Sequence, residues 1–187
     1  MIIRVAQIAD GADIAAIYAP IVEHTYISFE ETAPSAEEMS ARIAATLETH
    51  PWLVAEEDGN VIAYAYATTH RARAAYKWSC DVSVYVSQSM KRCGLGGKLY
   101  THLFTTLVQL GFGSVFAGIA LPNKASVGMH EHMGFTPVGI YPKVGFKNGS
   151  WRDVGWWSRP LQVLENAPKA PLTFAKNRQS FQSIELI

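Results

Sequence analysis

Apolar and polar side chains alternate most regularly over residues 82–86, where Val82, Val84 and Val86 enclose a serine and a tyrosine. A period of two is typical of a β-strand. A polar turn with three glycines follows, and leucines then recur at every fourth position from Leu95 to Leu107. Since that spacing is helical, the pattern predicts a strand, a glycine-rich turn and a helix in this order.

The same two periods divide much of the remaining chain into further elements. They predict strands over residues 2–7, 52–56, 61–68, 114–120, 135–144 and 151–158, and helices that begin at Asp10, Ser35 and Asn123. Pro20 is expected to divide the first of these helices into two pieces, because proline lacks the N–H of a helical hydrogen bond. Ser35 and Glu38 have the spacing of a capping box, and residues 57–60 that of a hairpin turn.

This order of elements predicts an α/β fold, with a mixed central β-sheet flanked by helices in a single domain. The domain is expected to cover residues 1–160, which is an ordinary size for one domain. Beyond Pro160 the periodicity fades, and residues 161–187 form a C-terminal tail with a linker-like stretch at 166–171. The pattern leaves open whether this tail is an ordered arm or a disordered end.

Composition narrows the class of protein. Hydrophobic residues make up 49% of the chain and charged residues 17%, which supplies a core and argues against disorder. Sixteen basic residues balance sixteen acidic ones, so the net charge gives no reason to expect a nucleic-acid or membrane partner. No run approaches the ~20 apolar residues of a membrane span. Cys80 and Cys93 lack the spacing of a metal site, so we expect no metal and, with so few cysteines, a cytoplasmic protein.

The glycine-rich turn has chemistry of its own. The first N–H groups of a helix have no partner within the helix, and they suit an anion such as a phosphate. Spacing excludes two well-known phosphate motifs: a P-loop needs Ser or Thr where Leu99 follows Gly97-Lys98, and the dinucleotide motif needs a third glycine at that same place. A turn that only reverses the chain remains the alternative.

Residues 91–96, Lys-Arg-Cys-Gly-Leu-Gly, resemble the pyrophosphate loop of the GNAT superfamily of N-acetyltransferases, usually written Gln/Arg-x-x-Gly-x-Gly/Ala. Lys91 departs from the usual first residue but keeps a positive charge. Four further segments look like the phosphinothricin acetyltransferase family, which includes the methionine sulfoximine acetyltransferases. They are residues 50–56; 84–87 with 94–96 and 99–102; 121–123 with 126–127 and 129–131; and 145–155. The resemblance extends over about residues 2–158 and implies a GNAT fold.

The resemblance also implies acetyl-CoA as co-substrate and assigns residues to it. The pantetheine would lie along Val84, Tyr85 and Val86, and the pyrophosphate would sit on the N–H groups of Arg92, Cys93, Gly94, Leu95, Gly96 and Gly97. Asn123 contacts CoA, or is the N-cap of its helix, or does both. Family members are commonly homodimers, and the candidates for an interface are Trp151, Trp156 and Trp157.

Asp81 is the first candidate for acid–base catalysis. An amine is mostly protonated near neutral pH, so a base must take its proton before the amine attacks a thioester. The family has a glutamate for this purpose at the position of Asp81, whose side chain is one methylene shorter. Asp81 would therefore act through a water molecule, or the pocket would take a different substrate. Its alternative role is an ion pair with a nearby arginine.

His130 is the second candidate. It lies four residues before Gly134, where many GNAT enzymes have a tyrosine that protonates the departing CoA thiolate. An imidazole can serve as acid or base at neutral pH. The alternative is a histidine that only packs on its helix face beside Met133.

The acceptor site is expected to involve Phe29, Arg71, Arg73 and Tyr76, the last three within a segment similar to the family's Lys/Arg-x-Arg-x-Ala-Tyr. Guanidinium groups bind carboxylates and phosphinates, although both arginines could equally be solvated surface residues. We therefore predict an N-acetyltransferase that moves the acetyl group of acetyl-CoA, by direct attack, to the α-amino group of a small amino-acid-like acceptor. The alternatives are an acetyltransferase for protein N-termini or polyamines, and a non-catalytic acetyl-CoA-binding module. Arg71, Arg73 and Lys77 disfavour a polyamine, which is itself cationic.

Overall fold

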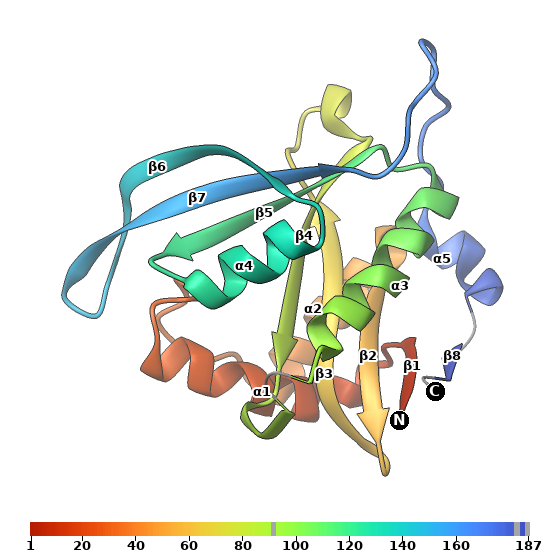
Figure 1. Ribbon diagram of the computed structural model, residues 1–187. Helices are drawn as coiled ribbons and strands as arrows, with labels where there is room; N and C mark the ends of the chain where they lie inside the picture. Colours follow the sequence, from red (N-terminus) through yellow and green to blue (C-terminus); the bar gives the residue numbers. More distant parts are fainter. Residues whose placement is uncertain (91–92, 182–183, 186–187) are drawn as a thin grey trace.

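In the computed structural model, which describes residues 1–90, 93–181 and 184–185, helices cover both faces of a mixed β-sheet (Figure 1). Over these residues the sheet has eight strands in the order β6-β7-β5-β4-β3-β2-β1-β8. The strands are β1 (Ile2–Val5), β2 (Trp52–Glu57), β3 (Asn60–Thr69), β4 (Ser79–Val86), β5 (Ser114–Leu121), β6 (Thr136–Lys147), β7 (Ser150–Pro160) and β8 (Ile184–Glu185). The helices are α1 (Gly11–His24), α2 (Ala36–Thr49), α3 (Leu95–Leu110), α4 (Lys124–His132) and α5 (Phe174–Asn177). The predicted α/β fold with a mixed sheet flanked by helices is confirmed.

The two faces of the central strand β4 are covered by different helices. The ring of Tyr85 faces α1, where its centroid lies 5.1 Å from that of Tyr18 in an edge-on contact. Val84 lies on the opposite face, next to Gly96 at the start of α3. Because side chains alternate along a strand, Asp81 shares the α1 face with Tyr85.

Strands β4 and β5 are parallel, and they pair only at their first three residues, 79–81 with 114–116. Beyond this point the two strands part, while β4 stays paired with β3 up to Val86 and β5 stays paired with β7 up to Leu121 (Figure 1). The peptide groups that line the gap have no strand partner among the described residues. Since backbone N–H and C=O groups seek hydrogen-bond partners, this edge of β4 is available to a ligand.

Several local predictions are confirmed by hydrogen bonds. The Ser35 Oγ accepts from the N–H of Glu38 at 3.2 Å, and the Glu38 carboxylate accepts from the N–H of Ser35 at 2.8 Å, which is the capping box of α2. Strands β2 and β3 form the predicted hairpin. Asn123 is the N-cap of α4, because its Oδ1 accepts from the N–H of Ser126 at 3.1 Å.

The first helix departs from the prediction in two ways. Helix α1 is continuous, so the expected division at Pro20 is wrong. A proline removes one backbone donor and leaves the other helical bonds in place, and the buried Tyr18 and Val22 on either side keep both halves in the core. Asp10 precedes the helix as predicted, but its carboxylate binds the guanidinium of Arg4 at 2.7 Å and gives α1 no side-chain cap.

The described part of the C-terminal tail packs on the rest of the fold. Phe174 is fully buried. The N–H of Leu172 donates to the carbonyl of Leu110 at 2.8 Å, and the indole N–H of Trp78 donates to the carbonyl of Lys169 at 2.8 Å. Strand β8 pairs with β1 at the edge of the sheet. These residues therefore form an ordered arm, while the division of the chain at residue 160 stays a prediction.

One residue predicted for a protein interface is not available on the surface. Trp151 is 60% exposed, whereas Trp157 is only 7% exposed. The indole N–H of Trp157 donates to the carboxylate of Glu131 in α4 at 3.3 Å. The side chain of Trp157 therefore lies inside the molecule, and the prediction that Trp157 belongs to an interface is wrong.

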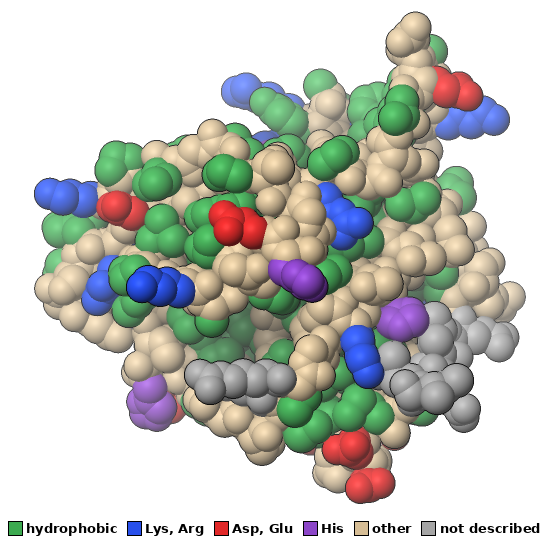
Figure 2. All heavy atoms as spheres, viewed as in Figure 1, with side chains coloured by type: hydrophobic (Ala, Val, Ile, Leu, Met, Phe, Trp, Pro, Cys, Tyr) green, Lys and Arg blue, Asp and Glu red, His purple; other side chains and the backbone are tan. Residues whose placement is uncertain are grey.

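The surface carries mixed charge. On the face that Figure 2 shows, Lys and Arg side chains are scattered and do not gather in one patch, in keeping with the equal numbers of basic and acidic residues, 16 and 16. Among the helices of the described ranges, none has the length and apolar character to cross a bilayer. Over the same ranges, His, Cys, Asp and Glu side chains form no group of three or more that could hold a metal ion.

Candidate active site

A cavity of about 70 Å³ lies where β4 and β5 part. Its walls are residues 82–85 of β4 and 117–120 of β5, together with Ile27, Tyr100 of α3, and Asn123, Ser126 and His130 of α4. Four of the predicted site residues, Val84, Tyr85, Asn123 and His130, therefore meet at one opening although they come from two separate parts of the chain. The open edge of β4 forms one side of it.

The two candidate catalytic residues flank β4 from opposite faces. Asp81 lies on the α1 face, in register with Thr68 of β3 and one residue before the cavity wall begins. His130 lies on the other face, where it is hydrogen-bonded to Tyr100 of α3. The side chains of Asp81 and His130 therefore lie on opposite sides of the place where the two strands part.

Asp81 is hydrogen-bonded to a histidine, and not to an arginine as its alternative role required. Its Oδ1 lies 2.6 Å from Nδ1 of His70, and both side chains are largely buried, 28% and 11% exposed. The imidazole of His70 is stacked on Phe116 of β5, with ring centroids 4.2 Å apart. Burial raises the pKa of Asp81, and the hydrogen bond from His70 and the charge of Arg71 oppose this rise. A carboxylate with a raised pKa is a better proton acceptor than one in open water.

His130 is buried and hydrogen-bonded through both ring nitrogens. Its Nδ1 lies 2.8 Å from the carbonyl of Ser126, and its Nε2 lies 3.1 Å from the hydroxyl of Tyr100. Because a carbonyl only accepts, Nδ1 carries the proton and Nε2 accepts from the tyrosine. Burial lowers the pKa of His130, and the bond to the Ser126 carbonyl opposes this. His130 thus lines the opening as a neutral imidazole with a hydrogen bond at each ring nitrogen.

The glycine-rich turn presents free backbone donors at the start of α3. Gly94 has φ of 72°, a left-handed conformation that favours glycine. The first helical hydrogen bond runs from the N–H of Lys98 to the carbonyl of Gly94 at 3.1 Å. The N–H groups of Leu95, Gly96 and Gly97 therefore have no acceptor within the helix, as an anion site requires. Cys93 is exposed beside them, and Arg92 lies outside the described residues.

The predicted acceptor residues lie on the Asp81 face in two groups. Arg71, Arg73 and Tyr76 are exposed, and the ring of Tyr76 meets that of His70 edge-on with centroids 6.0 Å apart. Phe29 comes from the loop between α1 and α2 and packs against β6, so closely that a Cβ at Gly145 would overlap its ring.

Lys147 holds this loop in place, and sequence analysis does not single it out. Its buried Nζ donates to the carbonyls of Val22, Ser28 and Glu30 at 2.6, 2.8 and 2.6 Å. The carboxylate of Glu30 accepts two further bonds from Arg42 of α2, at 2.7 and 2.8 Å. The end of β6 and the middle of α2 therefore fix the loop that carries Phe29.

His70 is the second residue that sequence analysis misses, although the chain holds a signal for it. Strands β3 and β4 pair in antiparallel register, with Thr68 opposite Asp81 and Thr69 opposite Cys80. A residue directly after Thr69 is thereby brought close to Asp81. A histidine just beyond the strand that precedes a candidate carboxylate is the pattern that could have revealed the pair.

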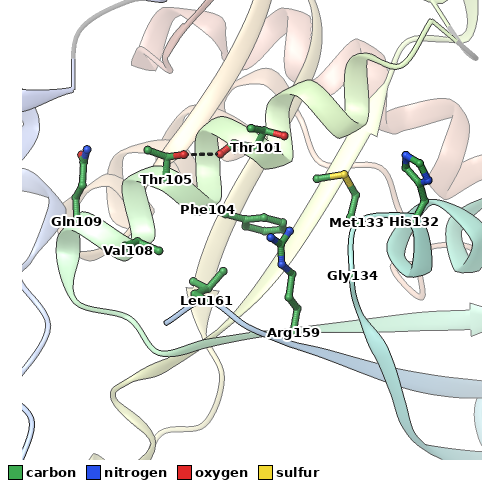
Figure 3. A pocket seen from close by; sticks show the side chains of 10 residues that line it. All are labelled: Thr101, Phe104, Thr105, Val108, Gln109, His132, Met133, Gly134, Arg159 and Leu161. Atoms are coloured by element: carbon green, nitrogen blue, oxygen red, sulfur yellow. Dashed lines mark hydrogen bonds between the residues drawn. The ribbon is translucent and has the colours of Figure 1, made fainter. Parts of the chain in front are cut away.

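A wider cavity lies away from these residues. It measures about 670 Å³ and lies between α3, α4 and the end of β7 (Figure 3). In Figure 3 the guanidinium of Arg159 lies over the ring of Phe104, 4.8 Å from its centroid, and the Thr105 hydroxyl donates to the Thr101 carbonyl at 2.9 Å. None of the predicted site residues lines it, so cavity size alone does not locate the chemistry.

The layout restricts what the opening can bind. A ligand that uses both the free edge of β4 and the free N–H groups of α3 needs an extended arm with amide groups and a phosphate at its far end. The pantetheine and pyrophosphate of a coenzyme A thioester have this composition, and Asp81 and His130 stand on either side of the place where the arm would end. The fold and the site therefore define an acyl-CoA-dependent acyltransferase.

The chain belongs to the GNAT acetyltransferases, since the family model described as acetyltransferase (GNAT) domain matches residues 3–156. It is 39% identical to the phosphinothricin N-acetyltransferase of Streptomyces viridochromogenes, over 91% of this chain and 92% of that protein. It is 34% identical to the L-methionine sulfoximine/L-methionine sulfone acetyltransferase of Salmonella typhimurium, over 89% of this chain and 97% of that protein. Both relatives fall in the family that the sequence resembles, so that prediction is confirmed.

A solved structure agrees with this assignment. The phosphinothricin acetyltransferase of Sinorhizobium meliloti, determined in complex with AcCoA, superposes with a TM-score of 0.84 at 34% identity, over 90% of this chain and 91% of that one. The fold described above is therefore the GNAT fold, and the chain is an acetyl-CoA-dependent N-acetyltransferase by family.

Proposed function

We propose that this protein transfers the acetyl group of acetyl-CoA to the α-amino group of a small amino-acid-like acceptor, of the phosphinothricin or methionine sulfoximine kind. The observation that carries the proposal is the opening between β4 and β5, with a carboxylate on one face and a histidine–tyrosine pair on the other. The named relatives act on acceptors of this kind, which supports the choice of acceptor.

The free edge of β4 binds the pantetheine of acetyl-CoA through the backbone of Val84, Tyr85 and Val86. The pyrophosphate takes the N–H groups of Leu95, Gly96 and Gly97, where the helix start favours negative charge. Asn123 already accepts from the N–H of Ser126, and its place in the wall of the opening also lets it contact the coenzyme.

The reaction begins on the Asp81 face, where Asp81 helps to remove a proton from the acceptor's amine. The freed nitrogen attacks the thioester carbonyl, whose oxygen is stabilised by backbone N–H groups of β4. The carbon–sulfur bond then breaks, and the thiolate leaves on the other face. There His130 takes a proton from the solvent at Nε2 and passes it through the Tyr100 hydroxyl, 3.1 Å away, to the sulfur.

The acceptor is bound by residues around Asp81. Arg71 and Arg73 provide guanidinium groups for its carboxylate or phosphinate. Tyr76 and Phe29 provide aromatic walls, and the position of Phe29 is supported by Lys147 through the loop carbonyls. Two adjacent cations suit an anionic amino acid better than a polyamine.

We further propose that two copies associate through the hairpin of β6 and β7. Six large apolar side chains of this hairpin are between 48% and 60% exposed, and they are Val138, Ile140, Tyr141, Val144, Phe146 and Trp151. An exposed apolar surface of this kind is typical of an interface. The proposed location is the cytoplasm, which the low cysteine content, two in the chain, supports. Sedimentation of the purified protein tests the homodimer, and a monomer at micromolar concentration would contradict it.

The acceptor is tested by following the release of free CoA thiol. Phosphinothricin, methionine sulfoximine, methionine sulfone and ordinary amino acids are compared with a peptide that has a free N-terminus and with spermidine. Turnover is expected with the amino-acid-like acceptors. Faster turnover of the peptide or of spermidine would favour the first alternative, and acetyl-CoA binding without release to any acceptor would favour a binding module.

A further inference from the structure

The imidazole of His70 is held on three sides at the acceptor face of β4. Its Nδ1 lies 2.6 Å from Oδ1 of Asp81, a short distance for an N–H···O bond and typical of one to a charged acceptor. One face of the ring is stacked on Phe116 with an interplanar angle of 16°. Tyr76 and Trp156 meet it edge-on, each with centroids 6.0 Å away. A side chain held in this way keeps one orientation.

This orientation decides which ring nitrogen can accept a proton. An ionised carboxylate only accepts, so Nδ1 of His70 must carry the hydrogen that Asp81 receives. In the neutral imidazole Nε2 then bears the lone pair. No hydrogen bond to Nε2 occurs within the described ranges of the chain, so in these ranges the lone pair has no hydrogen-bond partner.

We propose that His70, and not Asp81, takes the proton of the acceptor's amine. Asp81 is the positioning residue that orients the imidazole and stabilises its charged form. The inference rests on the proposed function and assigns one of its steps. It removes the difficulty of the short aspartate side chain, because the imidazole extends the base from the Asp81 carboxylate towards the acceptor. The same division of labour, a carboxylate behind a histidine, is used by serine hydrolases.

The proton balance follows from the product. An ammonium group loses two protons when it becomes a secondary amide. The first passes to Nε2 of His70, which leaves the nitrogen lone pair free to form the bond to the carbonyl carbon. The second proton leaves the nitrogen for water as the tetrahedral intermediate collapses. The electron pair of the carbon–sulfur bond goes to the thiolate, which gains one proton on the His130 face. The imidazolium of His70 is stabilised by the Asp81 carboxylate until it returns its proton to water.

Other ionisable groups lie beside the pair. Arg71 donates from its guanidinium to the carbonyl of His70 at 2.8 Å, and its charge opposes the rise that burial causes in the pKa of Asp81. Tyr76 lies at the edge of the imidazole, and the buried Cys80 precedes Asp81 in β4. The positive charge of Arg71 favours the ionised carboxylate that the proposal requires.

The test compares His70→Asn with His102→Asn, a control that removes an imidazole of α3 which lies beside β1 and the C-terminal arm. Asparagine can still donate to Asp81 from its side-chain amide but has no nitrogen that accepts the amine's proton. The kcat of His70→Asn is expected to fall by about 10²–10⁴-fold at neutral pH, with unchanged affinity for acetyl-CoA. Its activity should recover as the pH approaches the pKa of the acceptor's own amine, and added imidazole should restore part of it.

Asp81→Asn keeps the shape of the site and gives a second, independent reading. It should lose as much activity as His70→Asn, and the double variant should lose little more, because the two residues act as one unit. Full activity of His70→Asn with the pH profile of the control would overturn the proposal, as would a loss confined to Asp81→Asn. If the unaltered enzyme releases no CoA with any acceptor, the proposed function fails, and the inference fails with it.

Discussion

The hydroxyl of Tyr100 donates to Nε2 of His130 across 3.1 Å and joins α3 to α4 at the wall of the opening. Tyr100 is fully buried, so this bond has no competition from water. Tyr100→Phe removes the donor and leaves a buried acceptor without a partner, which should cost about 1–3 kcal/mol of stability.

The same substitution tests the role of the pair in catalysis. We expect the kcat of Tyr100→Phe to fall by about 10²-fold while the Kd for acetyl-CoA is unchanged, because only the proton for the sulfur is lost. Denaturant unfolding and CoA release measure the two effects separately. A destabilised variant with full turnover would show that the pair serves only packing.

Gly145→Ala should disturb the acceptor site without touching its polar groups. The new Cβ would overlap the ring of Phe29 and push it from its place on β6, at an overpacking cost of about 1–3 kcal/mol. The KM for the acceptor should rise and the KM for acetyl-CoA should not. Gly139→Ala, in the same strand as Gly145, is the control, because a Cβ at Gly139 would have no atom within 4 Å. Equal effects of the two changes on the acceptor KM would argue against a role for Phe29.

Lys147→Met should destabilise the enzyme by about 3–5 kcal/mol, because three carbonyl groups in buried surroundings lose their shared donor. Thermal or denaturant unfolding measures the loss. Lys143→Met, the same change at an exposed position of β6, should have little effect. If Lys147→Met stays folded, we also expect a higher KM for the acceptor, since the loop bearing Phe29 is released. A stability equal to that of Lys143→Met would contradict the role assigned to Lys147.

Stability should fall as the pH is lowered through the range of histidine titration. Burial lowers the pKa of His50 and of His130 in the folded protein, while both return to an ordinary value of about 6.5 on unfolding. Below that value the unfolded chain binds more protons than the folded one, so acid favours unfolding. The stabilisation is complete above about pH 6.5 and is lost progressively at lower pH.

His50→Gln isolates this effect away from the proposed chemistry, since the imidazole of His50 contacts Thr49 and Phe112. Its melting temperature should depend less on pH below neutrality than that of the unaltered protein. A series of melting curves across this pH range measures the difference. Parallel curves for the two proteins would show that His50 does not contribute to the acid sensitivity.

Local patterns in the sequence predict the part of the site that is proposed to hold the coenzyme. The strand, turn and helix around Gly94 follow from periodicity and glycine spacing, because each is decided by neighbours within a few residues. Asn123 as an N-cap and the Ser35–Glu38 capping box are local in the same sense. The helix through Pro20 could not be foreseen, because the packing of Tyr18 and Val22 outweighs a local preference.

The acceptor side depends on contacts between distant segments. Lys147 reaches carbonyls that are 117 to 125 residues away in the chain, and no spacing rule connects them. The bond between His70 and Asp81 follows from the register of β3 on β4, which periodicity alone does not set. The parting of β4 from β5 is also a property of the assembled sheet. For these reasons the sequence indicated the coenzyme more clearly than the acceptor.

The arm formed by residues 161–181 also determines how much of one edge of the sheet is exposed to other molecules. It leads to β8, which pairs with Ile2 and Ile3 of β1, so the border strand of the sheet is occupied by the same chain. An open border strand is a template on which further chains can add. The arm thereby covers part of this border, and a chain cut after Pro160 should lose the buried packing of Phe174 and associate with itself through β1.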